Sequence, residues 1–199
     1  MPFGFLKRRP DDQGQESDAG RGGAAGRPAA GARLRGVSFE AITEDWRLAG
    51  QMDIDGRLSD ALNRGQKLAI HDVRWGSPES GAVLEPAPGF QSVDPYDLIL
   101  VTAGDESLPP LTDAERAALV IQKTPFEVAL EVPPYRVVGT VYLFPGSGPD
   151  RLMDRSAGMF LPVTNASATL DGVKVTDPDA DVLLVNRFYL RGVEQVERS

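Results

Sequence analysis

Four short sequence matches between the two halves of this chain constrain its fold more than any other feature. The matched pairs are Trp46–Gly50 with Tyr135–Gly139, Arg57–Asp60 with Arg151–Asp154, Leu68–Asp72 with Leu161–Asn165, and Asp97–Val101 with Asp181–Val185. They keep their order along the chain, and their offsets differ only by changes in loop length. Self-similarity of this kind is the signature of a repeated structural unit. We therefore expect a tandem duplication.

The second copy has the sequence pattern of short β-strands. Apolar Val128, Leu130 and Val132 alternate with other residues, and aromatic and β-branched residues fill 135–144, a composition that favours half-buried strands. Asp171-Gly172 is a dipeptide typical of a tight hairpin turn. We predict strands over 128–132, 135–144, 159–170, 173–176, 181–185 and 188–196.

The first copy follows the same plan with different connections. Arg57–Asn63 is predicted as a short helical turn that ends at Asn63 and Gly65. The proline-containing stretch 76–93 is predicted as a mobile surface loop. Thr112–Glu115 reads as a capping box, so the one substantial helix is expected over 113–121, between the two copies.

About five short strands in roughly 60 residues favour a small barrel, because closure removes exposed sheet edges. The predicted fold is mostly β, with two tandem small β-barrel units of the SH3/Sm-like kind. An open two-sheet sandwich shared by both copies is the alternative. The predicted parts are a disordered basic tail (1–36), a first β unit (37–104), a connecting segment with a short helix (105–125) and a second β unit (126–199).

The tail differs in charge and composition from the remainder. Residues 1–36 contain seven basic and four acidic side chains, a net charge of +3, which leaves −11 for the rest of a chain whose total is −8. Residues 10–36 are rich in Gly, Ala and Pro, which predicts a flexible linker. Ahead of it, Phe3, Phe5 and Leu6 precede Lys7, Arg8 and Arg9. Such a segment is suited to docking on a protein partner or to weak, reversible contact with an anionic membrane surface.

Composition excludes several functions. The chain has no cysteine and one histidine, so disulfides, thiolate sites and multi-histidine metal sites are excluded. The strongly acidic body repels phosphate backbones, which counts against nucleic-acid binding. The apolar start is too short for a signal peptide, and we expect a cytoplasmic protein, peripheral at most to the inner face of the membrane.

Parts of both copies resemble a family of short bacterial proteins that has no known activity. The matching stretches are Pro134–Leu143, Phe160–Ala166, Asp181–Arg187 and Gly56–Asn63. A looser likeness is to Sm-like barrels, on a strand with Gly139 and a late Val185-Asn186-Arg187 strand. Sm-like proteins bind RNA through an Arg-Gly dipeptide that is missing at the corresponding place here. This likeness therefore implies a fold and not an RNA-binding function.

The candidate binding residues within the β units are Arg47, His71, Asp72 and Arg136. A serine hydrolase would need a positioned serine and an oxyanion hole beside His71-Asp72, and Thr164-Asn165 occupies the matched position, so we favour a structural role for this pair. We expect no catalytic residues, cofactor or metal. The predicted function is a non-catalytic interaction or scaffold protein that the N-terminal segment tethers. The alternative is a small-ligand or nucleotide sensor in a cleft between the units, with Arg47, Arg136 and the His71-Asp72 loop as its ligand contacts.

Overall fold

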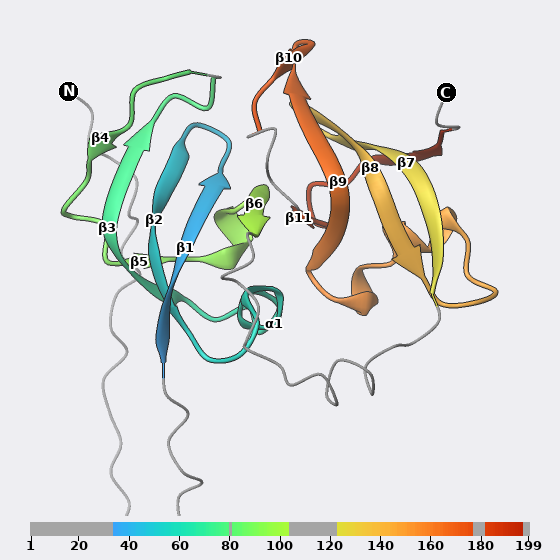
Figure 1. Ribbon diagram of the computed structural model, residues 1–199, viewed down its shortest axis with the longest axis horizontal. Coiled ribbons are helices and arrows are strands. Elements are labelled where there is room, and N and C mark those ends of the chain that lie inside the picture. The colour runs from blue at the N-terminus through green and yellow to red at the C-terminus, as the bar shows by residue number, and fades with distance from the viewer. Residues whose placement is uncertain (1–33, 80, 104–122, 177–181, 197–199) are drawn as a thin grey trace, which may run out of the picture. The chain divides into compact units, whose positions relative to one another are not determined.

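The computed structural model describes residues 34–79, 81–103, 123–176 and 182–196, and within these residues the fold is mostly β with one α-helix (Figure 1). We refer to residues 34–103 as the first half and to residues 123–196 as the second half. The first half contains β1 (Arg35–Ile42), β2 (Arg47–Ile54), α1 (Leu58–Asn63), β3 (Leu68–Gly76), β4 (Glu85–Pro86), β5 (Ser92–Val93), the 3-10 turn η1 (Pro95–Asp97) and β6 (Leu100–Ala103). The second half contains β7 (Thr124–Val132), β8 (Tyr135–Leu143), the 3-10 turns η3 (Pro149–Met153) and η4 (Arg155–Ala157), β9 (Phe160–Leu170), β10 (Val173–Lys174), β11 (Val182–Asn186) and β12 (Gly192–Gln195).

Most of the predicted elements are confirmed. The helical turn at Arg57–Asn63 is α1, and the alternating and β-branched runs of the second copy are β7, β8 and β9. The Asp171-Gly172 turn joins β9 to β10, and both residues have positive φ angles, +49° and +82°, as a primed hairpin turn requires. The predicted loop 76–93 contains the short strands β4 and β5, and the helix expected over 113–121 lies outside the described residues.

The strands form one antiparallel sheet in the order β12-β7-β8-β9-β11-β6-β1-β2-β3-β4. Outside this order, β10 pairs with β9 and β5 pairs with β3. The two ends of this order, β12 and β4, do not pair with each other among the described residues. The sheet is therefore open, and the two predicted tandem barrels are not confirmed. The physical reason lies in the middle of the sheet, where β6 of the first half pairs with β11 of the second, so that the two halves share one sheet.

The two halves nevertheless repeat one pattern of strand pairing. The first strand of each half pairs with its second, the second with its third, and the last strand returns to the first, β6 to β1 and β12 to β7. By the same rule β5 corresponds to β11, because each pairs with the third strand of its half. The predicted match of Asp97–Val101 with Asp181–Val185 joins strands with different partners. In the topology, residues 93–98 correspond to residues 185–190.

A β-bulge occupies corresponding positions of the two halves. The ladder between β2 and β3 shifts at Gly50, and the ladder between β8 and β9 shifts at Gly139. A Cβ atom on either glycine would lie 2.9 Å from a backbone oxygen, that of His71 or of Thr164. The next residue, Asp72 or Asn165, has a φ near +50°, a conformation that Asp and Asn tolerate better than most other side chains.

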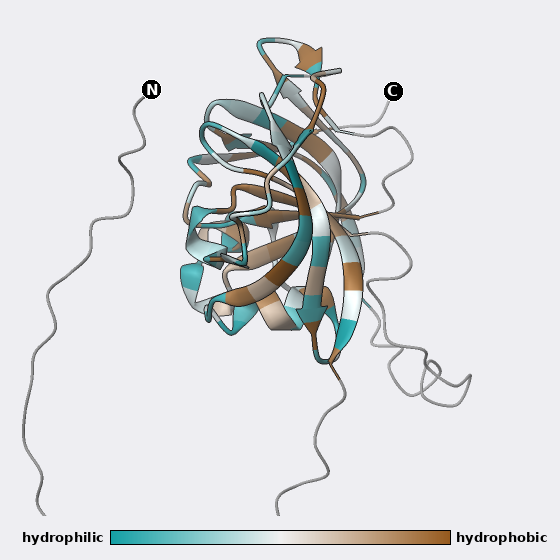
Figure 2. Ribbon diagram, turned by 90° about the vertical axis from the view of Figure 1, so that its left-hand side faces the viewer, coloured by the Kyte–Doolittle hydropathy of each residue, from teal (hydrophilic) through white to brown (hydrophobic). Residues whose placement is uncertain are grey.

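The core consists of two hydrophobic clusters that exchange residues between the halves. Met159, Phe160 and Leu184 of the second half belong to the cluster of the first half. Ile42, Ile99 and Leu100 of the first half belong to the cluster of the second. Hydrophobic and hydrophilic residues alternate along the strands (Figure 2), as expected for strands with one face buried. Residues 32–199 accordingly form one compact unit.

Candidate functional site

Three aromatic rings lie in series at one end of the first half, and we call Trp46, Trp75 and Phe90 the aromatic platform. The rings of Trp46 and Trp75 stack with centroids 4.4 Å apart, and those of Trp75 and Phe90 are 5.6 Å apart. Trp46 is 43% exposed and Phe90 is 39% exposed, whereas Trp75 packs partly against the core. Large aromatic side chains with this much exposed surface are typical of binding sites.

The turn between β1 and β2 positions Trp46. The backbone N–H of Thr43 donates to the Trp46 carbonyl at 2.8 Å, and the Trp46 N–H donates to the Thr43 hydroxyl at 3.0 Å. These two hydrogen bonds fix the four-residue turn 43–46, and β2 begins at the next residue. Leu48 of β2 then lies opposite Trp75 of β3, so both side chains share one face of the sheet. Trp46, two residues before Leu48, therefore meets Trp75 at the end of that face.

The chain after β3 positions Phe90. The N–H of Ala87 donates to the Val73 carbonyl at 2.8 Å, and the N–H of Phe90 donates to the Ala87 carbonyl at 3.1 Å. This turn is thereby held against β3 and brings Phe90 to the open side of Trp75. The platform consequently rests on three segments that are tied to one another by backbone hydrogen bonds, which makes it a preformed surface.

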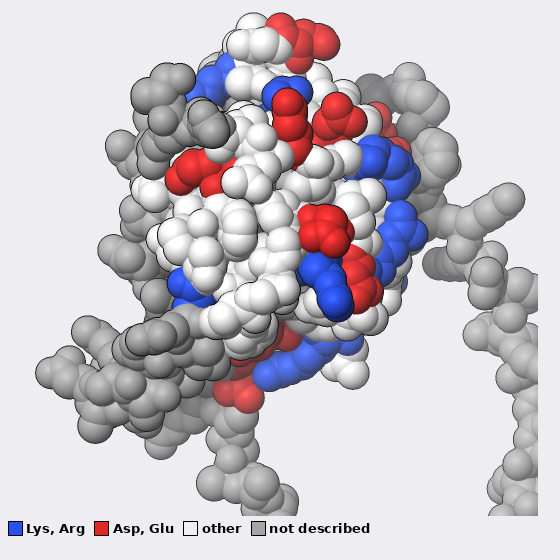
Figure 3. Space-filling view, turned by 90° about the vertical axis from the view of Figure 1, so that its right-hand side faces the viewer, with Lys and Arg blue, Asp and Glu red and all other residues white. Residues whose placement is uncertain are grey.

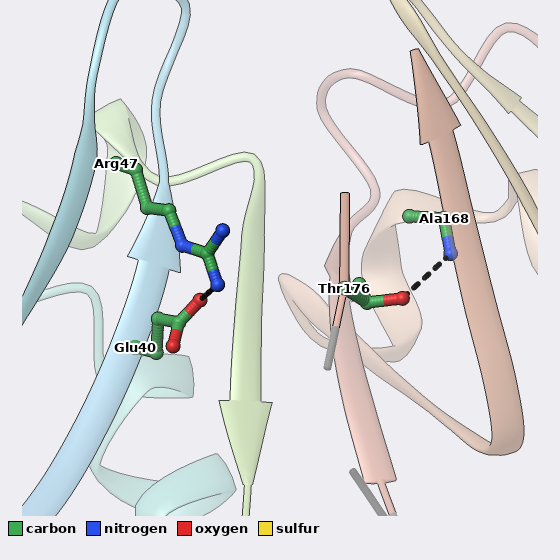
Figure 4. A network of polar contacts seen from close by, with 4 residues as sticks. All are labelled: Glu40, Arg47, Ala168 and Thr176. Atoms are coloured by element: carbon green, nitrogen blue, oxygen red, sulfur yellow. Dashed lines mark hydrogen bonds and ion pairs between the residues drawn. The ribbon is translucent and has the colours of Figure 1, made fainter. Parts of the chain in front are cut away.

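The surroundings of the platform are acidic. Glu44 and Asp45 directly precede Trp46 and are exposed, and Glu85 lies opposite Trp75 in the β3–β4 ladder. The cation on β2, Arg47, forms an ion pair with Glu40 (Figure 4), and the side chain of Arg47 is 15% exposed. The charge of Arg47 is thus neutralised and largely buried. Arg74, which precedes Trp75 on β3, is exposed, but strand alternation turns it to the other face of the sheet, and it donates to the Leu84 carbonyl at 2.8 Å. The field at the platform therefore favours a cationic ligand.

A second aromatic contact lies where the two halves meet. Tyr96, which is half exposed, and Phe188 occupy corresponding positions of the two halves, and their rings are 5.5 Å apart. The guanidinium of Arg155 lies 5.4 Å from the Phe188 ring centroid, within the range of a cation–π contact. The Tyr189 hydroxyl donates to the Tyr96 carbonyl at 3.3 Å, and burial, followed by the charges of Glu44 and Asp97, raises the pKa of Tyr189.

Asn186 links the two halves beneath this contact. The residue is fully buried, and its side-chain amide donates to the carbonyl of Leu98 at 2.7 Å and to that of Pro95 at 3.4 Å. Its own side-chain oxygen accepts from the Phe188 N–H at 3.0 Å. The corresponding residue of the first half, Asp94, also accepts from the N–H two residues later, Tyr96. The aromatic contact at the joint therefore rests on a structural hydrogen-bond cluster.

The predicted binding residues of the β units do not come together. Arg136 is 52% exposed and pairs with Glu194 at 3.3 Å. It lies on β8, five strand-to-strand steps from Arg47 on β2, or about 24 Å along the sheet. His71 and Asp72 are exposed and sit at the bulge of β3, where Asp72 has a backbone role. Phe3, Phe5, Leu6, Lys7, Arg8 and Arg9 lie outside the described residues.

Two other features of the described surface are a shallow depression and a face of mixed charge. A shallow depression of about 390 Å³ lies between the β7–β8 turn and the Asp171-Gly172 turn, lined by Pro134, Tyr135 and Arg136 among others. On the face shown in Figure 3, acidic and basic side chains lie close together beside wide uncharged areas. Within residues 34–79, 81–103, 123–176 and 182–196 there is no cluster of three side chains able to hold a metal ion, and no helix long and apolar enough to span a membrane.

Comparison with known proteins finds no family model, no curated protein and no solved structure that matches this chain. The aromatic platform is thus identified from its geometry. Sequence analysis places Trp46 only in a repeated segment and does not single out Trp75 or Phe90. The sequence contained one signal, which is that the chain has two tryptophans. That the two rings stack is seen in the structure.

Proposed function

We propose that this protein is a non-catalytic interaction protein that binds a partner protein on the aromatic platform. The observation that supports this proposal is the stacked pair Trp46–Trp75 continued by Phe90, with two of the three rings about two-fifths exposed. Tryptophan is enriched among the residues that contribute most to protein interfaces. Because Asp45 directly precedes Trp46 and Glu85 lies opposite Trp75, the partner segment should combine apolar and cationic side chains.

We further propose that the two halves are SH3/Sm-like units that arose by tandem duplication, and that the N-terminal segment Met1–Arg9 tethers them to an assembly or a membrane surface. The shared order of pairing and the corresponding bulges at Gly50 and Gly139 support the duplication. The three apolar and three cationic side chains of Met1–Arg9 support the tether. In this proposal the open sheet is the scaffold, and the platform and the N-terminal segment are its two contact elements.

The sensor alternative receives less support from the geometry. It requires Arg47, Arg136 and the His71-Asp72 bulge to share a ligand. The strand order separates the two arginines by five steps, and Arg47 is already paired with Glu40. In the described part of the chain these residues therefore offer a ligand no common site.

The experiment compares partner capture by the full chain with capture by two variants. Trp46→Ala removes the outer ring of the platform, and Tyr142→Ala removes a half-exposed aromatic ring on β8, away from the platform. We expect the wild-type chain and Tyr142→Ala to retain the same partner from a lysate and Trp46→Ala to lose it. Truncation of a central interface tryptophan should weaken binding by about 2 kcal/mol or more, roughly thirtyfold. Equal retention by all three proteins would refute the proposal.

A further inference from the structure

Two carboxylates lie beside the aromatic platform without a positive partner in the described part of the chain. Glu85 is exposed and lies opposite Trp75 in the β3–β4 ladder, so the Cβ atoms of this pair are about 5 Å apart on one face of the sheet. Asp45 is also exposed and directly precedes Trp46. Neither carboxylate forms an ion pair with another described residue. A cation that approaches the platform would therefore meet negative charge that is not neutralised.

The cations of the described chain leave the platform rings open. Arg47, the residue after Trp46, is paired with Glu40. The described residues form two cation–π contacts, and both involve rings of the second half, Phe144 and Phe188. The platform thus combines open aromatic rings with unpaired carboxylates, which together are the components of a cation-binding site.

The geometry favours a guanidinium over an ammonium group. A guanidinium is planar, stacks on an aromatic face and keeps its N–H donors in its own plane, where they can reach a carboxylate beside the ring. The stacked rings of Trp46 and Trp75, with Glu85 on the neighbouring strand, supply such a ring and such a carboxylate. An ammonium group is a more strongly hydrated point charge and cannot stack.

We propose that the platform recognises an arginine side chain of the partner protein, whose guanidinium lies on the exposed rings and pairs with Glu85. This inference rests on the proposed function of the platform and names the side chain that the platform selects. Neighbouring platform rings are 4.4 and 5.6 Å apart, and alternate side chains of an extended chain lie about 6.8 Å apart on one face. An apolar side chain two residues from the arginine would therefore contact a second ring. The partner segment should carry an arginine and an apolar residue separated by one position.

The chain supplies its own reporter for the test, because both of its tryptophans belong to the platform. Tryptophan fluorescence of the full chain is titrated with the peptide acetyl-Arg-Gly-Leu-amide and with its lysine and citrulline counterparts. Citrulline keeps the shape of arginine and lacks its charge. We expect the arginine peptide to bind with a dissociation constant of about 1 mM, the lysine peptide about threefold more weakly and the citrulline peptide about tenfold more weakly.

Glu85→Gln tests the carboxylate, and Glu194→Gln is its matched control. Glu194 is exposed on β12, at the other end of the strand order from β3 and β4. Glu85→Gln should weaken binding of the arginine peptide about threefold and leave binding of the citrulline peptide unchanged. The control should leave binding of both peptides unchanged. High salt should weaken binding of the arginine peptide to the wild-type chain more than binding of the citrulline peptide, because it screens the ion pair.

Three results would overturn the inference. The first is equal affinity for the three peptides, or no response to any of them up to about 10 mM. The second is an equal loss of the arginine and citrulline peptides in Glu85→Gln, which would mean that Glu85 supports the fold of the platform and does not pair with the ligand. The third is a fluorescence change that follows protein concentration without peptide, which would assign the platform to a second copy of the chain.

The capture experiment separates failure of this inference from failure of the proposed function. If Trp46→Ala loses the partner and the chain does not distinguish the peptides, the platform binds its partner through other side chains and only the inference fails. If Trp46→Ala retains the partner, both fail.

Discussion

Replacement of Asn186 by aspartate tests the joint between the two halves. The amide of Asn186 donates to the Leu98 carbonyl at 2.7 Å in a fully buried position. An ionised carboxylate there would place a negative oxygen against the Leu98 carbonyl oxygen at a position shielded from solvent. Asn186→Asp should therefore fold with the new carboxyl group protonated, since a buried acid without a partner is neutralised.

The cost of that protonation sets the magnitude. An aspartate with an unfolded pKa near 3.9 must be held protonated at pH 7, which costs at most about 4 kcal/mol, and at pH 5 at most about 1.5 kcal/mol. For a chain of this size, a loss of 4 kcal/mol lowers Tm by about 8–16 °C. Because the protonated acid can still donate to Leu98, most of this loss should disappear on acidification.

The assay is thermal unfolding of wild type, Asn186→Asp and Asp94→Asn at pH 7 and pH 5. Asp94→Asn is the matched control, because it occupies the corresponding turn and keeps an oxygen acceptor for the Tyr96 N–H. We expect a change of about 0.5 kcal/mol, in the stabilising direction at pH 7 because the charge of Asp94 beside Asp97 is removed. A Tm loss for Asn186→Asp that is below 2 °C at pH 7, or that is equal at both pH values, would refute the reasoning.

Three further predictions concern stability. Gly139→Ala would place a Cβ 2.9 Å from the Thr164 carbonyl oxygen and 3.0 Å from the Ala166 Cα, so denaturant unfolding should show a loss of about 1–3 kcal/mol in the free energy of unfolding. The control Gly89→Ala, whose Cβ would have nothing within 4 Å, should be nearly neutral. Equal effects of the two substitutions would contradict the account of the bulge. Burial, followed by the nearby charge of Asp94, raises the pKa of Asp97, so its ionisation costs stability as pH rises through its folded pKa. Asp97→Asn should therefore raise Tm at neutral pH and not in acid. Hydrogen bonds from Ser156 lower the pKa of Asp154, so its carboxylate stabilises the fold above its unfolded pKa and loses this effect as pH falls through the lower, folded pKa. Asp154→Asn should lower Tm at neutral pH and lose its effect in acid, and the same sign for both variants would count against these assignments.

The local elements were predictable because short-range patterns determine them. Alternation predicts β7, and Asp171-Gly172 predicts its hairpin turn, from residues that are neighbours in the sequence. That the sheet is open was not predictable in this way, because it depends on which strands β11 pairs with. Leu184 lies opposite both Val101 of β6 and Pro162 of β9, and nothing in its own sequence specifies two partners from different halves.

The candidate site failed to appear in the sequence for a related reason. Trp46, Trp75 and Phe90 are separated by 29 and 15 residues, and only the pairing of β2 with β3, and the turn that returns to β3, bring them together. The sequence match, in contrast, aligns Asp72 with Asn165, and both residues have a φ near +50°. Both positions require a residue that tolerates a left-handed backbone conformation after a bulge. Asp and Asn meet this requirement, so the local sequence indicates it.

The joint between the halves also determines how the chain would behave if it were cut. Residues 34–103 and 123–196 each contribute side chains to the other's core and share the β6–β11 ladder. Expressed as two separate polypeptides, each half would expose an apolar strand edge and an incomplete core that the other completes. We therefore expect the two fragments to complement one another in trans. Their reassembly would then report that two proteins fused to them have met.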